Sequence, residues 1–291
     1  MNKNVSLSSL IKSKSSSAKN ILDTLLNDAI KNQASSIHLE NDNNQLNLRY
    51  RIASHLQKIK DLPVAWINIL DVHLKKLANL SDNQNLPQEG RFKIKIGKID
   101  KNLIVSFWPK FQGNKITIKI LDDNKLNKLA LSKKDFEQMQ KTLKQKNGLI
   151  LLTQIKLLDK DKILYALLEQ IDNEHLDIFT LEDFIERPLP GIHQQQLKNW
   201  QDDEVCQHLE KLLRHQPDVI MISKITGPRI AKSTINAAMT DQLVIAYLPN
   251  SDLKNGLECL INWGIDPYIL QNVLKITIVQ KDDKLKLLKE N

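Results

Sequence analysis

Glycine is scarce in this chain, and the few glycines are spread too widely for the loops that cradle phosphate. Only 8 of the 291 residues are glycine, and no two lie closer than the seven positions that separate Gly90 from Gly97. The phosphate loop G-x-x-x-x-G-K-[ST], the dinucleotide loop G-x-G-x-x-G and the hydrolase elbow G-x-S-x-G all need closer spacing. The sequence therefore excludes these three motifs.

Cysteine is also rare, and no apolar stretch is long. Cys206 and Cys259 lie far apart, and neither has a paired cysteine or histidine at ligand spacing. We therefore expect no disulfide framework and no zinc cluster. No apolar run approaches the ~20 residues that are needed to span a bilayer. These absences predict a cytoplasmic protein without a metal site.

Aromatic residues are few, and the positive charge is concentrated at the ends of the chain. Aromatic side chains make up 5% of the residues, which leaves little surface on which bases could stack. The formal net charge is +8, and the four lysines of residues 1–20, which contain no acidic residue, supply half of it. A basic protein suggests nucleic-acid binding, but solvated lysines explain this charge. We keep that function only as a minor alternative and expect no nucleic-acid partner.

Apolar periodicity divides the first half of the chain into an arm, a domain and a linker. Serine and lysine dominate residues 1–20, which we predict to be a disordered basic arm. Residues 21–122 are predicted to form a small α+β domain. Helical stripes and period-two alternation mark elements near 21–30, 46–52, 64–80, 92–96, 103–107 and 116–120. The polar stretch 123–135 is predicted to be a linker.

From residue 136 onward, short continuous apolar runs alternate with helical stretches. We predict buried strands at 148–153, 176–180, 219–222 and 243–247. Helices are predicted at about 160–171, 201–215, 229–239 and 252–262. Apolar strands that alternate with helices indicate a parallel sheet covered on both faces. Residues 136–291 are therefore predicted to form an α/β domain.

Seven short blocks occur in the order of a known family. They are A-S-S-I-H-L-E at 34–40, R-Y-R-I at 49–52, L-P-Q-E-G-R at 86–91, T-L-E-D-F-I-E at 180–186, L-R-H-Q-P-D-V-I-M at 213–221, A-A-M-T at 237–240 and W-G-I-D-P at 263–267. Through these blocks the chain resembles the type II secretion and type IV pilus assembly ATPases, the GspE/PilB group of hexameric traffic motors. The resemblance covers about 21–281. It implies a RecA-like parallel-sheet domain at the C-terminus, preceded by a small PAS-like α+β domain.

The resemblance fails where the family's phosphate loop should be. In the family, a strand ending L-L-T leads into G-P-T-G-S-G-K-T-T, whereas the same positions here read Q-I-K-L-L-D-K-D-K. Only Lys160 of that loop remains. Glycines let backbone N–H groups approach the phosphates, and we expect Leu157 and Leu158 to fill that space. Asp161 replaces the hydroxyl that would hold Mg²⁺.

Charge at these positions also opposes a nucleotide. Asp159 and Asp161 would place negative charge where a triphosphate sits. Two like charges ~4 Å apart repel by about 4 kcal/mol at an effective dielectric of ~20, which is about a thousandfold in affinity. In the family's G-E-I-R-D block, Lys224 stands at the catalytic glutamate. The family's histidine block has lost both histidines, and Ile104 replaces the arginine that would reach the γ-phosphate.

We therefore predict a degenerate nucleotide site with no catalytic residue, no metal ligand and no cofactor. Its candidate residues are Asp159, Lys160, Asp161, Glu182, Asp183, Glu186 and Lys224. Glu182 and Asp183 are expected at the carboxyl edge of the sheet, where ligands bind in α/β folds. We expect Lys160 and Lys224 to pair with the carboxylates in an internal network that replaces Mg-ATP.

The prediction for function is a pseudo-ATPase, with a structural or regulatory role in a type IV pilus or type II secretion assembly platform. The resemblance implies a family motor paralogue or an inner-membrane platform protein as partner, in a homo- or hetero-hexamer. It also implies a cytoplasmic location, peripheral to the inner face of the inner membrane. The main alternative is a subunit with residual ATP and Mg²⁺ binding that needs an active neighbour. A decaying gene product is a further alternative.

Overall fold

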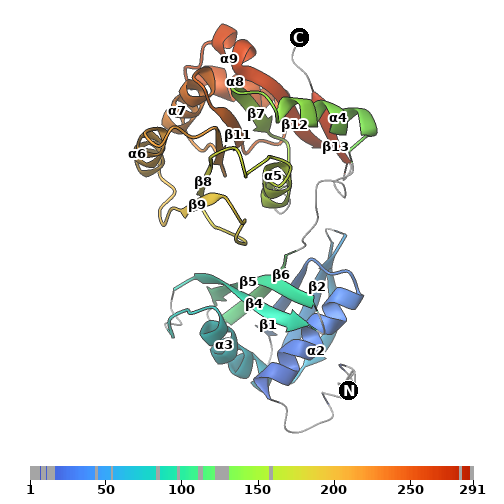
Figure 1. Cartoon of the computed structure of the whole chain (residues 1–291). Coiled ribbons are helices and arrows are strands. Elements are labelled where there is room, and N and C mark those ends of the chain that lie inside the picture. The colour runs from blue at the N-terminus through green and yellow to red at the C-terminus, as the bar shows by residue number, and fades with distance from the viewer. Residues whose placement is uncertain are drawn as a thin grey trace. The chain divides into compact units, whose positions relative to one another are not determined.

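The computed structural model consists of two compact units, Met1–Asp123 and Asn124–Asn291 (Figure 1). It describes residues 7, 11, 17–42, 45–53, 55–82, 86–96, 99–110, 114–121, 131–156, 160–281 and 284–288. The hydrophobic clusters of the first unit and of the second unit share no residue, so each unit builds its own core.

The first unit is a six-stranded antiparallel sheet with two helices on one face. The strands are β1 (Ser36–Asp42), β2 (Gln45–Ile52), β3 (His55–Leu62), β4 (Gln88–Ile96), β5 (Ile99–Pro109) and β6 (Asn114–Ile120). Their order across the sheet is β3-β2-β1-β6-β5-β4. Helices α2 (Ala18–Lys31) and α3 (Ala65–Leu77) pack on one face. This is the predicted α+β domain, while its likeness to PAS domains stays a prediction.

Alternation along the strands places the core of the first unit between the sheet and the helices. Ile37 pairs with Ile118 and Leu39 pairs with Ile116, and all four side chains are buried under the helices. The polar residues between them lie on the opposite face, as the two-residue period of a strand requires. Helix α2 begins after Ser17, whose side chain caps the helix by accepting a hydrogen bond from the Asn20 backbone N–H in the first turn.

The predicted arm at 1–20 contacts this core at two positions. Leu7 is buried in the core and Ile11 packs against it. These residues lie four positions apart, which is the spacing of neighbours on a helix face. The ranges 1–6, 8–10 and 12–16 lie outside the described residues.

The second unit is a seven-stranded sheet in the order β13-β12-β7-β11-β10-β8-β9. Its strands are β7 (Gly148–Leu152), β8 (Ile178–Glu182), β9 (His193–Gln196), β10 (Val219–Ile222), β11 (Leu243–Tyr247), β12 (Leu274–Lys281) and β13 (Lys284–Leu288). All neighbours are parallel except β12 and β13, which are antiparallel. The predicted α/β class with a parallel sheet is confirmed.

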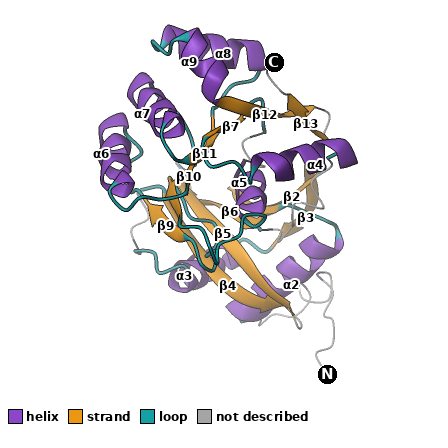
Figure 2. Cartoon of the chain, turned by 45° about the horizontal axis from the view of Figure 1, so that its top comes forward, coloured by secondary structure: helices purple, strands orange, loops and turns teal. Residues whose placement is uncertain are grey.

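Helices cover both faces of this sheet. They are α4 (Lys133–Thr142), α5 (Lys160–Leu168), α6 (Asp202–Leu213), α7 (Pro228–Met239), α8 (Leu253–Asn262) and α9 (Pro267–Val273). Ile150 and Leu152 of β7 join the core under α4 and α5, whereas Leu149 and Leu151 join the core under α6 to α9. Figure 2 shows α6 and α7 beside one another on that second face. None of the described helices is both long and apolar enough to cross a bilayer.

The observed elements differ from the predicted ones in a few places. Strand β8 begins two residues later than predicted and ends at Glu182, which makes Glu182 the last residue of a buried strand. Helix α4 begins inside the predicted linker, whose residues 123–130 lie outside the described part. Strands β1, β3, β9, β12 and β13 and helices α4 and α9 were not predicted.

Candidate functional site

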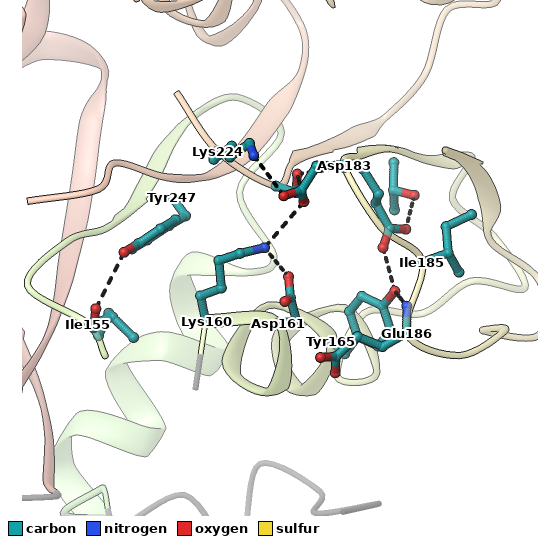
Figure 3. A network of polar contacts seen from close by, with 12 residues as sticks. Ile155, Lys160, Asp161, Tyr165, Asp183, Ile185, Glu186, Lys224 and Tyr247 are labelled. Atoms are coloured by element: carbon teal, nitrogen blue, oxygen red, sulfur yellow. Dashed lines mark hydrogen bonds and ion pairs between the residues drawn. The ribbon is translucent and has the colours of Figure 1, made fainter. Parts of the chain in front are cut away.

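Three chain segments bring charged side chains together at the carboxyl edge of the parallel sheet (Figure 3). Helix α5 begins with Lys160 and Asp161, Asp183 follows β8, and Lys224 lies two residues after β10. Strands β8 and β10 are hydrogen-bonded neighbours, so the segments that follow them meet. This is the edge at which parallel α/β sheets place their ligand sites.

Lys160 is a buried cation held by two carboxylates. Its Nζ donates a hydrogen bond to Asp161 Oδ1 and lies 3.4 Å from Asp183 Oδ1. Its side chain is only 5% exposed. Burial by itself lowers the pKa of Lys160, but the two carboxylates outweigh burial and raise the pKa above its ordinary value. Lys160 therefore stays protonated at neutral pH, and its charge is already neutralised by the chain.

Asp183 is the centre of the cluster. Lys224 Nζ lies 2.8 Å from Asp183 Oδ2, whereas Lys160 meets the other oxygen of the same carboxylate. The Ser223 hydroxyl donates to Asp183 Oδ1 at 2.8 Å and accepts from the Asp183 backbone N–H at 3.1 Å. Burial acts to raise the pKa of Asp183, but Lys160 and Lys224 hold it down to about 2. Asp183 is therefore ionised across the physiological pH range.

The four charged groups balance one another. Burial raises the pKa of Asp161, with Lys160 opposing this and Glu186 adding to it. Lys224 also lies over the ring of Trp200, 5.6 Å from its centroid. With Asp161 ionised, the described chain Lys224–Asp183–Lys160–Asp161 carries two positive and two negative charges and no net charge. We call these four residues the ion-pair chain.

A second polar cluster lies beside the first and is built on neutral hydrogen-bond donors. The Glu182 side chain is fully buried. It accepts hydrogen bonds from Tyr165 Oη, from Thr180 Oγ1 at 2.5 Å and from Gln194 Nε2 at 3.0 Å. Burial raises the pKa of Glu182, while these three donors act to lower it. Glu182 therefore does not take part in the ion-pair chain.

The same cluster fixes the loop between β8 and β9. The Tyr165 hydroxyl accepts from the Glu186 backbone N–H at 3.1 Å. The Gln194 side chain accepts from Leu189 N at 2.6 Å and donates to Arg187 O at 3.2 Å. Polar strand β9 thus supplies the side chains that satisfy the backbone of this loop.

The structure separates the predicted site residues into three groups. Lys160, Asp161, Asp183 and Lys224 meet, as the predicted pairing of the lysines with carboxylates requires. The predicted residues Glu182 and Glu186 instead meet at Tyr165. The predicted residues Leu157, Leu158 and Asp159 lie outside the described residues. Within the part of the chain that is described, no three His, Cys, Asp or Glu side chains are arranged as metal ligands.

Comparison with known proteins identifies the family. The family model described as "Type II/IV secretion system protein" matches residues 12–284. The chain belongs to this family.

Individual relatives in the secretion family agree with this membership but are longer. The chain is 28% identical over 266 residues to type II secretion system protein E of Pseudomonas aeruginosa, which covers 90% of this chain and 53% of the relative. It is 29% identical over 267 residues to the type IV pilus assembly ATPase PilB of Myxococcus xanthus, covering 90% and 47%. The chain spans about half the length of these curated relatives.

Solved structures show that this member of the secretion family has the RecA-like fold predicted for it. The ATPase DotB of Legionella pneumophila superposes with a TM-score of 0.72 at 15% identity, covering 96% of this chain and 81% of DotB. The pilus retraction motor PilT, solved with bound ADP, gives a TM-score of 0.65 at 18% identity, covering 93% and 83%.

The segment at the position of the secretion family's phosphate loop contains one residue in a backbone conformation that favours glycine. Gln154, at the position of the first family glycine, has a φ of 52°, in the left-handed region that favours glycine. Its N–H donates to Asn250 O at 3.0 Å, and Lys156 N–H donates to Gln280 Oε1 at 3.0 Å. Both backbone N–H groups are therefore hydrogen-bonded within the chain.

Sequence reasoning missed the neutral residues that organise the site. Ser223, Tyr165, Thr180 and Gln194 were not candidates, yet each bonds a predicted acidic residue or its backbone. Residue type gave little signal, because serine, threonine and glutamine occur throughout polar segments. The usable signal was position, since Ser223 directly follows β10 and Thr180 lies two residues before Glu182 on the same face of β8.

Proposed function

We propose that this chain is a catalytically inactive member of the secretion family, a pseudo-ATPase with a structural or regulatory role in a type IV pilus or type II secretion platform. The observation that carries the proposal is the state of Lys160. The lysine that the family's loop offers to phosphate is 5% exposed and is held between Asp161 and Asp183. A nucleotide would have to displace these carboxylates before it could reach the ammonium group.

Electrostatics at the site oppose a triphosphate. Asp161 and Asp183 would lie within a few ångströms of a phosphate bound at Lys160, because both already contact its Nζ. Each contact of this kind costs about 4 kcal/mol at ~4 Å and an effective dielectric of ~20. That cost corresponds to about a thousandfold in Kd. Lys224, at the position of the family's catalytic glutamate, is paired with Asp183 and supplies no carboxylate that could act as a base toward water.

Nucleotide binding by the full chain is the direct test. Isothermal titration with Mg-ATP and with Mg-ADP is expected to show no binding in the sub-millimolar range. PilT, which was solved with ADP, serves as the positive control in the same buffer. A clear sub-millimolar Kd for this chain would overturn the proposal and favour the alternative of a residual ATP-binding subunit.

Grafting the family's phosphate loop onto this chain tests whether the loop sequence or the rest of the fold prevents nucleotide binding. The variant carries the family sequence G-P-T-G-S-G-K-T-T in place of residues 154–162, which removes Asp159 and Asp161 and restores the glycines. Because the sheet and helices around the site have the family fold, we expect the graft to bind Mg-ATP more tightly than the natural chain. A graft that folds but binds no better would show that the obstacle lies beyond this segment.

Partners follow from the proposed role. A chain without turnover would act through contacts with a motor paralogue or an inner-membrane platform protein, as a member of a homo- or hetero-hexamer at the cytoplasmic face of that membrane. Co-purification of the tagged chain from its own cells, followed by mass spectrometry, tests this. Recovery of a motor paralogue or a platform protein is expected, and recovery of the chain alone would contradict it.

A further inference from the structure

The ion-pair chain joins segments that are far apart in the sequence. Lys160 and Asp161 open α5, Asp183 begins the loop after β8, and Lys224 lies in the loop after β10. Asp183 contacts both lysines, so it bridges α5 to the β10 loop through its two oxygens. The pilus retraction motor PilT, which shares the fold, was solved with bound ADP. In this chain, the contacts that join these segments are ion pairs between its own side chains.

Burial makes these contacts matter for stability. The side chains of Lys224 and Asp183 are 27% and 24% exposed, whereas those of Lys160 and Asp161 are more buried, at 5% and 13%. Exposed ion pairs contribute little because water and salt screen them. Removing one member of a buried pair instead leaves an uncompensated charge in a poorly solvated place. Asp183 is the member whose loss affects the most partners.

We propose that the ion-pair chain is an internal lock, which holds the start of α5, the β8–β9 loop and the β10 loop in one arrangement without any ligand. The inference rests on the proposed function, because a bound nucleotide would compete for Lys160. It goes beyond that function by assigning a positioning role to Asp183 and Lys224. The lock replaces ligand-dependent ordering of this edge with permanent ordering, and a rigid surface is what a scaffold offers to a partner.

Hydrogen–deuterium exchange on the full chain tests the lock. Asp183→Asn keeps the size of the side chain and its ability to bond Ser223, but it removes the charge that both lysines share. We expect exchange to rise by about tenfold or more in peptides covering 160–166, 183–192 and 223–226. The melting temperature is expected to fall by about 5–10 °C. Peptides of the first unit should exchange as in the natural chain.

Control variants distinguish a local effect on the ion-pair chain from general destabilisation of the unit. Lys254→Ala removes an exposed ion pair with Glu258 on α8 of the same unit, 3.8 Å apart, and should leave all three peptides unchanged. Lys224→Met acts at the most exposed member of the lock, so it should fold even where Asp183→Asn does not. It should speed exchange at 183–192 and at 223–226. In the Asp183→Asn background, Lys224→Met should add little, because its partner is already neutral.

The outcomes distinguish failure of the lock from failure of the proposed function. Mg-ATP that slows exchange at 160–166 in the natural chain would overturn the proposed function, whatever the variants do. A natural chain that ignores Mg-ATP, together with Asp183→Asn and Lys224→Met variants that exchange like the natural chain, would overturn the lock alone. Faster exchange spread evenly over both units would also overturn it, because a lock acts locally.

Discussion

Replacing Tyr165 by phenylalanine probes how the second polar cluster holds a fully buried carboxylate. Tyr165 and Tyr247 are both almost fully buried, at 2% and 3% exposure, in the core of the same unit. Their hydroxyls differ in what they contact. Tyr165 Oη donates to Glu182 and accepts from Glu186 N–H at 3.1 Å. Tyr247 Oη makes one long contact with Ile155 O, at 3.4 Å.

The expected cost of Tyr165→Phe follows from these contacts. A hydrogen bond to a charged group contributes about 1.5–3 kcal/mol, and a buried donor left without its partner costs about 1–3 kcal/mol. Because Thr180 and Gln194 still reach Glu182, we take the lower part of the sum and expect a loss of about 2.5–4 kcal/mol. Tyr247→Phe should cost about 0.5–1.5 kcal/mol, as for one neutral hydrogen bond. The phenylalanine ring keeps the contact of Arg187 with the ring at position 165.

Urea unfolding of the full chain measures this difference, with two transitions fitted because the chain has two units. The penalty for Tyr165→Phe should shrink as the pH is lowered, because burial raises the pKa of Glu182 and the protonated acid needs the donor less. Equal costs for the two tyrosines would refute the reasoning. A penalty that does not change with pH would show that Glu182 keeps one protonation state over the range measured.

Two further predictions concern other buried charges. Lys75→Met should destabilise the first unit by about 3–5 kcal/mol in urea unfolding, because Lys75 and Asp71 form a 2.8 Å pair that is almost fully buried; adding Asp71→Leu should recover most of that loss, and an additive double variant would contradict the pairing. Burial raises the pKa of Asp161 from 3.8 to about 6, so its stabilising contribution is fully present below pH 3.8 and is lost as the pH rises through about 6. The difference in stability between Asp161→Asn and the natural chain should therefore shift in favour of the variant as the pH rises from about 4 to 7, by at most about 3 kcal/mol, and urea midpoints that keep a constant difference over this range would exclude the effect.

The elements that the sequence predicted best are those whose apolar pattern is set by the core. Strands β10 and β11 begin and end at the predicted residues, because each is a continuous apolar run buried on both faces. Strand β9 reads H-Q-Q-Q and has no such pattern. Its glutamines satisfy the backbone of the β8–β9 loop, an interaction that only the tertiary structure creates. Strand β12 did carry a period-two alternation of Leu274, Ile276 and Ile278 that could have been recognised.

The candidate site was partly predictable for a topological reason. Parallel strands end at a common edge, so Asp183 and Lys224 could be placed near Lys160 from the positions of the strands alone. The same rule gives no information on which oxygen meets which ammonium group. It also placed Glu182 too near the ion pairs, because β8 ends at Glu182 and turns its side chain into the core rather than toward Lys160. A shift of one residue along a strand changes the face on which a side chain lies.

A site that binds nucleotide must keep a cationic group unneutralised until the ligand arrives, and this requirement conflicts with stability. In this chain the conflict is relieved, because Lys160 pairs with Asp161 and Asp183, and Lys224 pairs with the second oxygen of Asp183. The exchange of charge is coordinated. Introducing Lys224 alone would leave the cluster with one positive charge in excess, and introducing Asp161 alone would leave it with one negative charge in excess. Both substitutions together give balance. Selection for a folded, stable protein accounts for such balance, whereas loss of function without selection would scatter charges independently. On this argument, variants that restore Asp161→Thr or Lys224→Glu singly should each be less stable than the natural chain.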